Sequence, residues 1–368
     1  MRNIVVQYRR LSEIATNGRI PGIDGFSISQ EYESTLKANP FRDGQDVVFV
    51  KLGLVDGRFV GQEYVFPLNM SVNGKTMLSG SGSNTYVEEW ARKSGIGLEF
   101  AELHPDFRDG NFKVTGGSGL SQMSVRMHKL LGCNVFEYPR FVMLLKSRAL
   151  LETKLRGLMQ KILIVCADGC LWLYSQFLKL ASCVCSGGIN VSQVNPTDFR
   201  QINALGELTA SAHSRFYEVH DSSWFKWILN NSFSKYGSAK AYILNRKSKP
   251  VGFFVVKIRF HEQASQRGFR NVWLGSVIEW GALPGYEQKL MWKIMAWVAK
   301  ARKDLDAVEF PVFESFAQKF LRRLGWQHVG DANFCYRIRP DSGFVEPEGM
   351  DNPANWRLRP AMGDVGLN

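Results

Sequence analysis

The stretch of sequence that decides the fold runs from residue 85 to residue 97 and reads TYVEEWARKSGIG. Its beginning continues a strand-like segment, and its end opens a segment with the apolar spacing of a helix. Glycines at such a junction let the backbone approach a ligand, and the first amides of a helix favour negative charge. With Arg92 and Lys93 beside them, these residues predict either a diphosphate-binding loop or a glycine-rich strand–helix turn with basic surface residues.

The segments around this loop predict an antiparallel meander followed by alternating helices and strands. Two dipeptides, Asp56-Gly57 and Asn73-Gly74, suit the two-residue turns of β-hairpins. Gly132 stands where a helix C-cap is expected. In order, the first half should contain strands at 47–54, 58–67 and 75–87, a helix at 95–103, a strand at 111–115, a helix at 121–131 and a strand at 133–145.

The second half repeats this order of elements. It should contain strands at 239–244, 251–260 and 272–281, a polar loop at 261–271, a helix at 286–302, a strand at 307–313, a helix at 314–324 and a strand at 326–338. From Gly61 to Gly132 is 71 residues, and from Gly252 to Gly325 is 73. The near-equal intervals indicate a duplicated architecture.

Length and composition support two domains. A chain of 368 residues with 45% hydrophobic residues can bury a sizeable core in each. We expect an α/β (α+β) fold with two tandem domains, each a mixed, largely antiparallel twisted sheet flanked by helices. The predicted divisions are an N-terminal domain at 1–150, a connector with an apolar helix at 151–195, a C-terminal domain at 196–340 and an acidic tail at 341–368.

Charge and cysteine content narrow the possible partners and compartment. The net charge of +12 favours anionic partners, although a solvated basic surface is an equal alternative. The six cysteines lack zinc-type spacing, so we expect buried free thiols and no metal site. The N-terminus has no signal-peptide pattern, and we expect a cytoplasmic protein.

The apolar segment at 162–185 raises the question of a membrane. Asp168 and Lys179 interrupt it, and a spanning helix needs about 20 apolar residues in a row. We therefore expect a buried interdomain helix. The alternative is weak contact with a membrane surface, because basic residues precede the segment: Arg140, Lys146, Arg148, Lys154, Arg156 and Lys161.

In this context the first half resembles the GNAT superfamily of acyl-CoA-dependent N-acyltransferases. The family has a meander, then an Arg/Gln-x-x-Gly-x-Gly/Ala loop and a helix, and it closes with a Leu-Gly-aromatic turn. Here these features are Arg92–Gly97, Leu131-Gly132-Cys133 and, in the second half, Leu324-Gly325-Trp326. The resemblance covers about residues 26–147 and, more loosely, 215–340. Weaker features at Asn39-Pro40 and Trp356 are similar to features of large tandem acyltransferases found near bacterial surface-polysaccharide genes.

The resemblance implies acetyl-CoA or another short acyl-CoA as co-substrate. Its pyrophosphate would lie on the loop, and its pantetheine arm would pair with the strand that ends at Tyr86 and Val87. The loop residues implied in binding are Arg92, Lys93, Ser94, Gly95, Ile96 and Gly97. The second half has no such loop, so we do not expect it to bind CoA; its notable carboxylate is Glu279.

Two departures from the family concern catalysis. His128 occupies the position of the family tyrosine that protonates the leaving thiolate, and Ser121 occupies that of an asparagine. An imidazole titrates near neutrality and could supply that proton. The candidate bases are Glu63 and Glu88. The alternatives, which the sequence favours, are a surface helical histidine and solvated strand-end carboxylates.

We therefore expect an N-acyltransferase, in first place an acetyltransferase, that moves an acyl group from acyl-CoA to an amine by direct attack. The acceptor could be an amino sugar, an amino acid or a protein amine. One alternative is an aminoacyl transferase resembling the Fem family, which uses charged tRNA; nucleic acid is otherwise not an expected partner. Another is a non-catalytic GNAT-fold binding module at a membrane surface.

Overall fold

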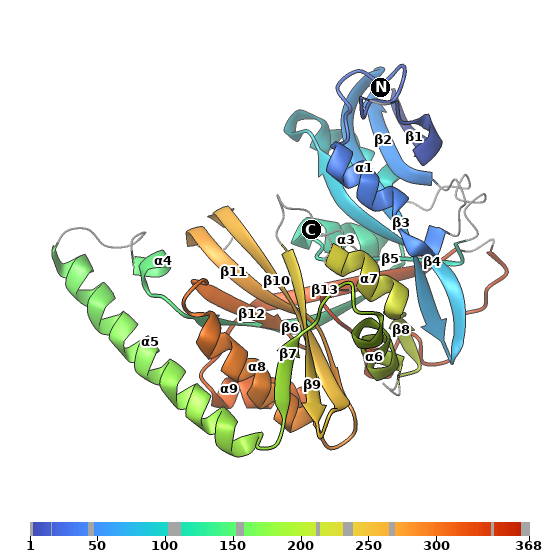
Figure 1. The fold of residues 1–368 in the computed structure, drawn as a ribbon. Helices are drawn as coiled ribbons and strands as arrows, with labels where there is room; N and C mark the ends of the chain where they lie inside the picture. Colours follow the sequence, from blue (N-terminus) through green and yellow to red (C-terminus); the bar gives the residue numbers. More distant parts are fainter. Residues whose placement is uncertain are drawn as a thin grey trace. The chain divides into compact units, whose positions relative to one another are not determined.

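The computed structural model describes residues 3–15, 17–42, 48–101, 112–151, 158–210, 214–230, 238–264, 269–339 and 342–361. The chain divides into two compact units, each assembled from separate segments (Figure 1). Unit 1 comprises Met1–Glu137, Ser214–Val219 and Ala332–Val365, and unit 2 comprises Tyr138–His213, His220–Asp331 and Gly366–Asn368.

Unit 1 is built on a mixed sheet with the strand order β1-β2-β3-β4-β5-β13. These strands are β1 (Ile4–Arg10), β2 (Val48–Val55), β3 (Arg58–Val72), β4 (Lys75–Val87), β5 (Val114–Ser118) and β13 (Gln327–Ile338). All neighbours are antiparallel except β4 and β5, which are parallel. The short β8 (Phe216–Glu218) pairs with the end of β3. The helices are α1 (Gln30–Lys37), α2 (Ile96–Ala101) and α3 (Gln122–Leu130), with 3-10 turns η1 (Leu11–Glu13), η2 (Pro40–Arg42), η3 (Glu89–Ser94) and η7 (Pro353–Asn355).

The predicted turns of unit 1 are confirmed by their backbone angles. Asp56 and Asn73 have φ of 51° and 49°, and the glycine after each is also positive. Two successive positive φ values define the type I′ turn, whose twist matches that of the flanking strands. Gly132 ends α3 with φ of 76°, as expected for a helix C-cap glycine.

Unit 2 repeats the arrangement, with the strand order β6-β12-β11-β10-β9-β7. Its strands are β6 (Asn134–Leu144), β7 (Asn190–Gln193), β9 (Ser238–Arg246), β10 (Lys249–Ala264), β11 (Phe269–Ala282) and β12 (Ala307–Pro311). Only β11 and β12 are parallel. Its helices are α4 (Arg148–Leu151), α5 (Leu158–Cys185), α6 (Phe199–Ala210), α7 (Ser222–Asn230), α8 (Glu287–Ala301) and α9 (Ser315–Arg323). The predicted loop at 261–271 is wrong at both ends, because strand pairing continues to Ala264 and resumes at Phe269.

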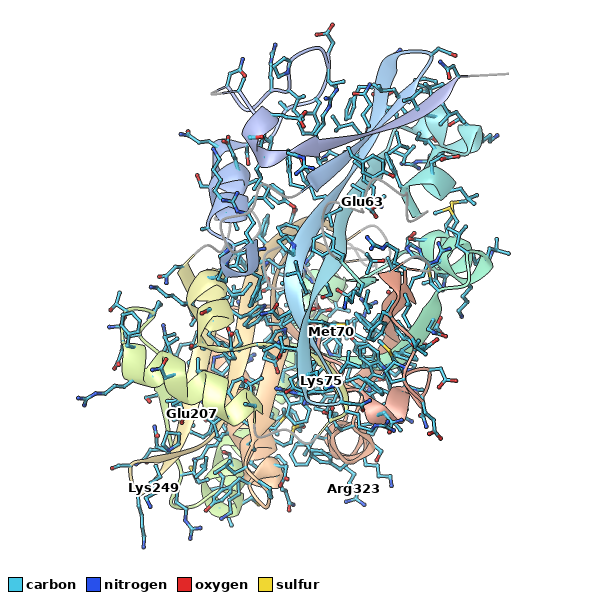
Figure 2. All side chains as sticks on the ribbon, turned by 90° about the vertical axis from the view of Figure 1, so that its right-hand side faces the viewer. Glu63, Met70, Lys75, Glu207, Lys249 and Arg323 are labelled. Atoms are coloured by element: carbon cyan, nitrogen blue, oxygen red, sulfur yellow. The ribbon has the colours of Figure 1, made fainter. Side chains whose placement is uncertain are left out.

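Side-chain alternation along the strands builds the core of unit 2. Phe254 and Val256 point to one face of β10, where they pack in one cluster with Leu290, Ile294 and Val298 of α8. All five side chains are fully buried, at 0% exposure. Burying each such side chain contributes roughly 1.5–3 kcal/mol. The charged side chains of Glu207, Lys249 and Arg323, labelled in Figure 2, are exposed and lie outside this core.

The two units exchange their final strands. The second part of β6, from Tyr138, belongs to unit 2, and the second part of β13, from Ala332, belongs to unit 1. The predicted domains at 1–150 and 196–340 were contiguous, whereas the compact units are interleaved along the chain. A sequence pattern locates a strand, but its partners depend on long-range hydrogen bonds.

The segment predicted as an acidic tail is, where the structure describes it, packed into unit 1. Trp356 is 3% exposed, and its ring lies against those of Phe136, Phe216 and Tyr336. The prediction of an acidic tail rested on five acids against two arginines. The aromatic contacts of Trp356 help to hold this segment against unit 1.

The expectation of a buried helix at 162–185 is wrong. One side of α5 packs in unit 2, where Leu178 is 1% exposed, but the opposite side is open. The same exposure corrects the prediction of buried thiols: Cys166, Cys170, Cys183 and Cys185 are free but exposed. Because α5 packs against unit 2 on one side only, the apolar residues on its other side stay exposed.

Candidate active site

The sheet of unit 1 opens between its two parallel strands. The pairing of β4 with β5 runs from Ser79↔Val114 to Gly82↔Gly117, and β4 then continues to Val87 alongside β3. A bulge in β4 lies at this point, because Tyr64 pairs with Ser83 while Gln62 pairs with Tyr86. Bulges redirect the backbone and its side chains and are frequent beside active sites.

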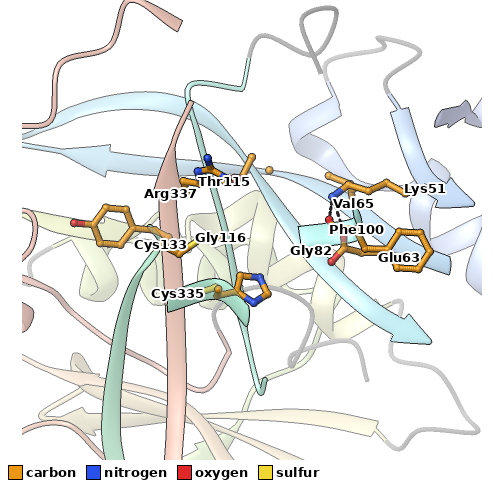
Figure 3. Close-up of a pocket in the computed structure, with 13 residues that line it drawn as sticks. Lys51, Glu63, Val65, Gly82, Phe100, Thr115, Gly116, Cys133, Cys335 and Arg337 are labelled. Carbon is orange, nitrogen blue, oxygen red and sulfur yellow. Dashed lines mark hydrogen bonds and ion pairs between the residues drawn. The ribbon is translucent and has the colours of Figure 1, made fainter. Parts of the chain in front are cut away.

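A pocket with a cavity volume of about 50 Å³ lies next to this opening (Figure 3). It is lined by Lys51, Glu63, Val65, Gly80, Gly82, Phe100, Thr115, Gly116, His128, Cys133, Cys335, Tyr336 and Arg337. All of these residues belong to unit 1. A candidate base and a candidate acid from the sequence, Glu63 and His128, therefore share one pocket.

Glu63 is held by a buried ion pair. Lys51 and Glu63 lie directly opposite each other on β2 and β3, and Lys51 Nζ is 2.6 Å from Glu63 Oε2. Lys51 also donates to the carbonyl oxygen of Phe100 at 2.5 Å. The Thr85 hydroxyl donates to Glu63 Oε1 at 3.1 Å. Glu63 is only 8% exposed, so the expectation of a solvated strand-end carboxylate is wrong for this residue.

His128 lies on α3 and has a fixed ring orientation. Its Nδ1 is 2.8 Å from the carbonyl oxygen of Ser124, one turn earlier. A carbonyl can only accept, so Nδ1 carries the proton in this bond, and Nε2 is the nitrogen available for proton transfer. The histidine that the sequence placed on the helix surface thus lines the pocket.

Two cysteines of the pocket are held as thiols. Burial raises the pKa of the Cys133 thiol, against an opposing effect of the Arg337 charge. Burial raises the pKa of Cys335 as well. Because the thiolate is the nucleophilic form, neither residue is suited to carry an acyl group. The buried Nη1 of Arg337 has no hydrogen-bond partner among the described residues, and this nitrogen can donate to an anionic group in the pocket.

The predicted phosphate loop lies at the end of β4. Gly95 has φ of 96°, which a residue with a side chain rarely adopts, and α2 begins at the next residue. Ile96 anchors the loop at 0% exposure, while Arg92 and Lys93 are exposed. A Cβ on Gly97 would lie 3.6 Å from Met127 Sδ, next to His128 on α3. The loop and the pocket are therefore adjacent parts of unit 1.

The other candidate residues lie outside the pocket lining. Glu88 accepts from the indole Nε1 of Trp90 and lies 3.7 Å from Arg58, at the surface. Ser121 is the N-cap of α3 and accepts from the Ser124 amide at 3.2 Å, which is a structural role. The remaining loop and strand positions are Tyr86, at 51% exposure, Val87, and Ser94, whose hydroxyl donates to the Ala91 carbonyl.

Unit 2 has a similar opening without the loop. The pairing of β11 with β12 ends at Ser276↔Glu309, and a bulge follows opposite Val255 and Val256. Glu279 is fully buried beyond it and is hydrogen-bonded to Nδ1 of His220. The two buried side chains satisfy one another in the core of unit 2.

Comparisons with solved structures agree with this fold. Saccharomyces cerevisiae N-myristoyltransferase with bound myristoyl-CoA has a TM-score of 0.56 at 13% identity, covering 92% of this chain and 79% of that one. A GCN5-related N-acetyltransferase from Anabaena variabilis has a TM-score of 0.53 at 11% identity, covering 91% and 73%. A probable N-acyltransferase from Enterococcus faecalis has a TM-score of 0.52 at 12% identity, covering 92% and 73%.

These likenesses show the fold: the chain has the GNAT-like architecture of acyl-CoA N-acyltransferases, in a two-unit form. No protein-family model matches the chain. No curated protein matches it either. The predicted fold class is confirmed, while the roles of individual site residues stay predictions.

Sequence reasoning missed Lys51 and Arg337. Lys51 interrupts an otherwise apolar strand, VFVKLGLV, and a single lysine in such a run is a signal of a buried, paired cation. Arg337 reaches the pocket from β13, the exchanged strand. Nothing in the local sequence pairs that strand with unit 1.

Proposed function

We propose that this chain is an acyl-CoA-dependent N-acyltransferase whose active site is the pocket of unit 1. The observation that carries the proposal is the opening of β4 from β5 at Gly82 and Gly117, beside a pocket that contains both Glu63 and His128. The fold supports it, because solved structures with this architecture include N-acyltransferases with bound myristoyl-CoA.

The co-substrate would bind along the end of β4. The pyrophosphate would lie on the loop from Arg92 to Gly97, where exposed cations stand beside a left-handed glycine. The pantetheine arm would follow the strand edge at Tyr86 and Val87, where β5 no longer pairs with β4. This course leads the thioester toward the pocket.

The reaction is direct attack by an amine. The acceptor nitrogen forms a bond to the thioester carbonyl carbon, and the carbon–sulfur bond breaks to release CoA as a thiolate. Glu63 takes the proton from the nitrogen, directly or through one water. His128 enters this step as the imidazolium, protonated on both ring nitrogens, and donates its Nε2 proton to the thiolate sulfur. The proton held by Glu63 then returns to His128 through water, which restores both groups. Lys51 and Thr85 position the Glu63 carboxylate.

The size of the pocket supports a short acyl group. A water needs roughly 10–15 Å³ on the same volume scale, so about 50 Å³ accommodates only a few heavy atoms. This volume favours an acetyl group over an acyl chain of many carbons. The acceptor class is an amine of an amino sugar, an amino acid or a protein.

Binding and turnover measurements test the proposal. Titration calorimetry with acetyl-CoA should give a dissociation constant in the micromolar range, and a panel of amines should include one that releases free CoA thiol. The absence of any binding at millimolar acetyl-CoA would overturn the proposal. Salt-dependent binding of charged tRNA without CoA binding would instead favour the aminoacyl transferase.

Matched variants test the residue roles. Glu63→Gln and His128→Gln should each lower kcat at least tenfold while the dissociation constant for acetyl-CoA changes less than threefold. Glu88→Gln and His328→Gln are the controls, because both residues are surface partners outside the pocket. If the control variants lost activity and the pocket variants kept it, the pocket would not be the active site.

A further inference from the structure

The outward side of α5 is a continuous apolar face. From residue 160 to residue 185, the exposed positions other than Lys161 carry no charge. The large side chains among them range from 41% exposed at Leu163 to 76% at Val184. This face consists of Ile162, Leu163, Val165, Trp172, Leu173, Phe177, Leu180 and Val184, with Cys166, Cys170, Cys183 and Cys185 between them.

A face of this kind marks an interaction surface. Soluble proteins rarely expose large contiguous apolar patches, because their contact with water is unfavourable. The 28 residues of α5 form a helix about 42 Å long, and the face follows most of that length. By length and composition the helix could also cross a membrane.

The topology of unit 2 excludes a crossing. The chain runs from β6 through α4 to the start of α5, and it continues from the end of α5 to β7. Both strands belong to the same sheet of unit 2, since β6 pairs with β12 and β7 pairs with β9. A spanning helix would place its two ends on opposite sides of about 30 Å of hydrocarbon. Strands of one hydrogen-bonded sheet cannot be separated in this way.

Three polar contacts also fix α5 lengthwise against unit 2. The Ser147 amide donates to Asp168 Oδ1 at 2.7 Å, and Arg302 Nη2 donates to the Asp168 carbonyl at 2.6 Å. The Tyr174 hydroxyl donates to the Leu324 carbonyl at 2.6 Å. These bonds hold the inner side of the helix, so the apolar face stays directed outward.

Positive charge accompanies the apolar face. Lys161 begins it and Lys179 lies along it, half-buried. Lys293, on the neighbouring helix α8, is half-buried. The acid of α5, Asp168, is bound to the Ser147 amide. An anionic partner therefore complements the border of the face.

We propose that α5 is an in-plane anchor that docks unit 2 on an anionic lipid bilayer. The apolar side chains would enter the boundary between headgroups and acyl chains, and the lysines would reach the lipid phosphates. A second copy of the chain fits less well. In a symmetric pair of these faces, the lysines of one copy would meet those of the other. The proposal is independent of the acyl transfer.

Vesicle flotation of the full chain tests the anchor. The protein should float with vesicles of phosphatidylcholine and 30% phosphatidylglycerol at low salt, and it should float less with phosphatidylcholine alone or at high salt. The triple variant Val165→Gln, Phe177→Gln and Val184→Gln should partition at least tenfold more weakly, because it removes apolar contact without changing charge.

The control is Val345→Gln, which changes an exposed valine of unit 1 that is 83% exposed. It should float like the wild type. The thermal midpoints of all variants should agree within a few degrees, because the substituted side chains are exposed. Wild-type protein that stays in the buffer, or a triple variant that floats like the control, would overturn the proposal. A dimer in light scattering that the triple variant dissociates, without flotation, would assign the face to a second copy.

Discussion

The phosphate loop offers the sharpest test of where CoA binds, because the chain contains a matched pair of glycines. Gly95 in unit 1 and Gly285 in unit 2 follow the splayed strands β4 and β11, and both have left-handed φ values, 96° and 83°. A Cβ at Gly95 meets only Ile4, at 3.9 Å, and one at Gly285 meets nothing within 4 Å. Aspartate can therefore be introduced at either position without a steric clash.

The two substitutions should have equal effects on folding and different effects on binding. A residue with a side chain in the left-handed region costs about 1 to 2 kcal/mol of stability, and this cost applies to both variants. Gly95→Asp in addition sets a carboxylate against the pyrophosphate and blocks the approach of the backbone. That repulsion should cost on the order of 2 kcal/mol of binding, which is about thirtyfold in affinity.

The assay is calorimetric titration of acetyl-CoA into the wild type, Gly95→Asp and Gly285→Asp, with urea unfolding of each. Lys93→Ala should weaken binding less than Gly95→Asp, because Lys93 is an exposed cation. Equal affinities for the wild type and Gly95→Asp would refute the loop as the pyrophosphate site. Loss of binding in Gly285→Asp alone would place the co-substrate in unit 2.

Two further predictions concern stability. Lys51→Met removes the partner of a Glu63 carboxylate that is 8% exposed, and it should lower the free energy of unfolding in urea by about 3 kcal/mol. Adding Glu63→Leu should restore most of that loss, and an additive double variant would contradict the buried-pair argument. Burial raises the pKa of Tyr174 to about 12, above the value of about 10 in an unfolded chain. The native state then holds this proton more tightly, so its contribution to stability is complete below pH 10 and is lost as the pH rises toward 12. Tyr174→Phe should show a smaller decrease in thermal midpoint over that interval, and an identical decrease would refute the assignment.

Local pattern was sufficient for most elements. The dipeptides Asp56-Gly57 and Asn73-Gly74 predicted two hairpins, because few residues other than asparagine, aspartate and glycine tolerate positive φ. Gly132 and Gly325 predicted two helix ends for the same reason. The helix α8 followed from its apolar period, since only one stripe of a helix can face the sheet.

The sequence predicted only part of the candidate site. The family resemblance suggested His128 as the acid and Glu63 as a base. The sequence alone favoured a surface location for both residues. Burial decided otherwise, because α3 and β3 face the same pocket. Glu88, the other base candidate, has the same chemistry, and only its surface contacts with Arg58 and Trp90 separate it from Glu63.

What the sequence by itself determined is the order of elements, the turns, the glycine loop at Arg92–Gly97 and the duplicated two-part organisation. The elements, turns and loop depend on neighbours within a few residues, and the duplication showed in the matching order and spacing of the two halves. What only the tertiary structure decided is which segments meet. The exchange of β6 and β13 brings Arg337 to the pocket of unit 1, and the packing of α5 leaves one apolar side open. Both depend on contacts between residues far apart in the chain, which local propensity does not encode.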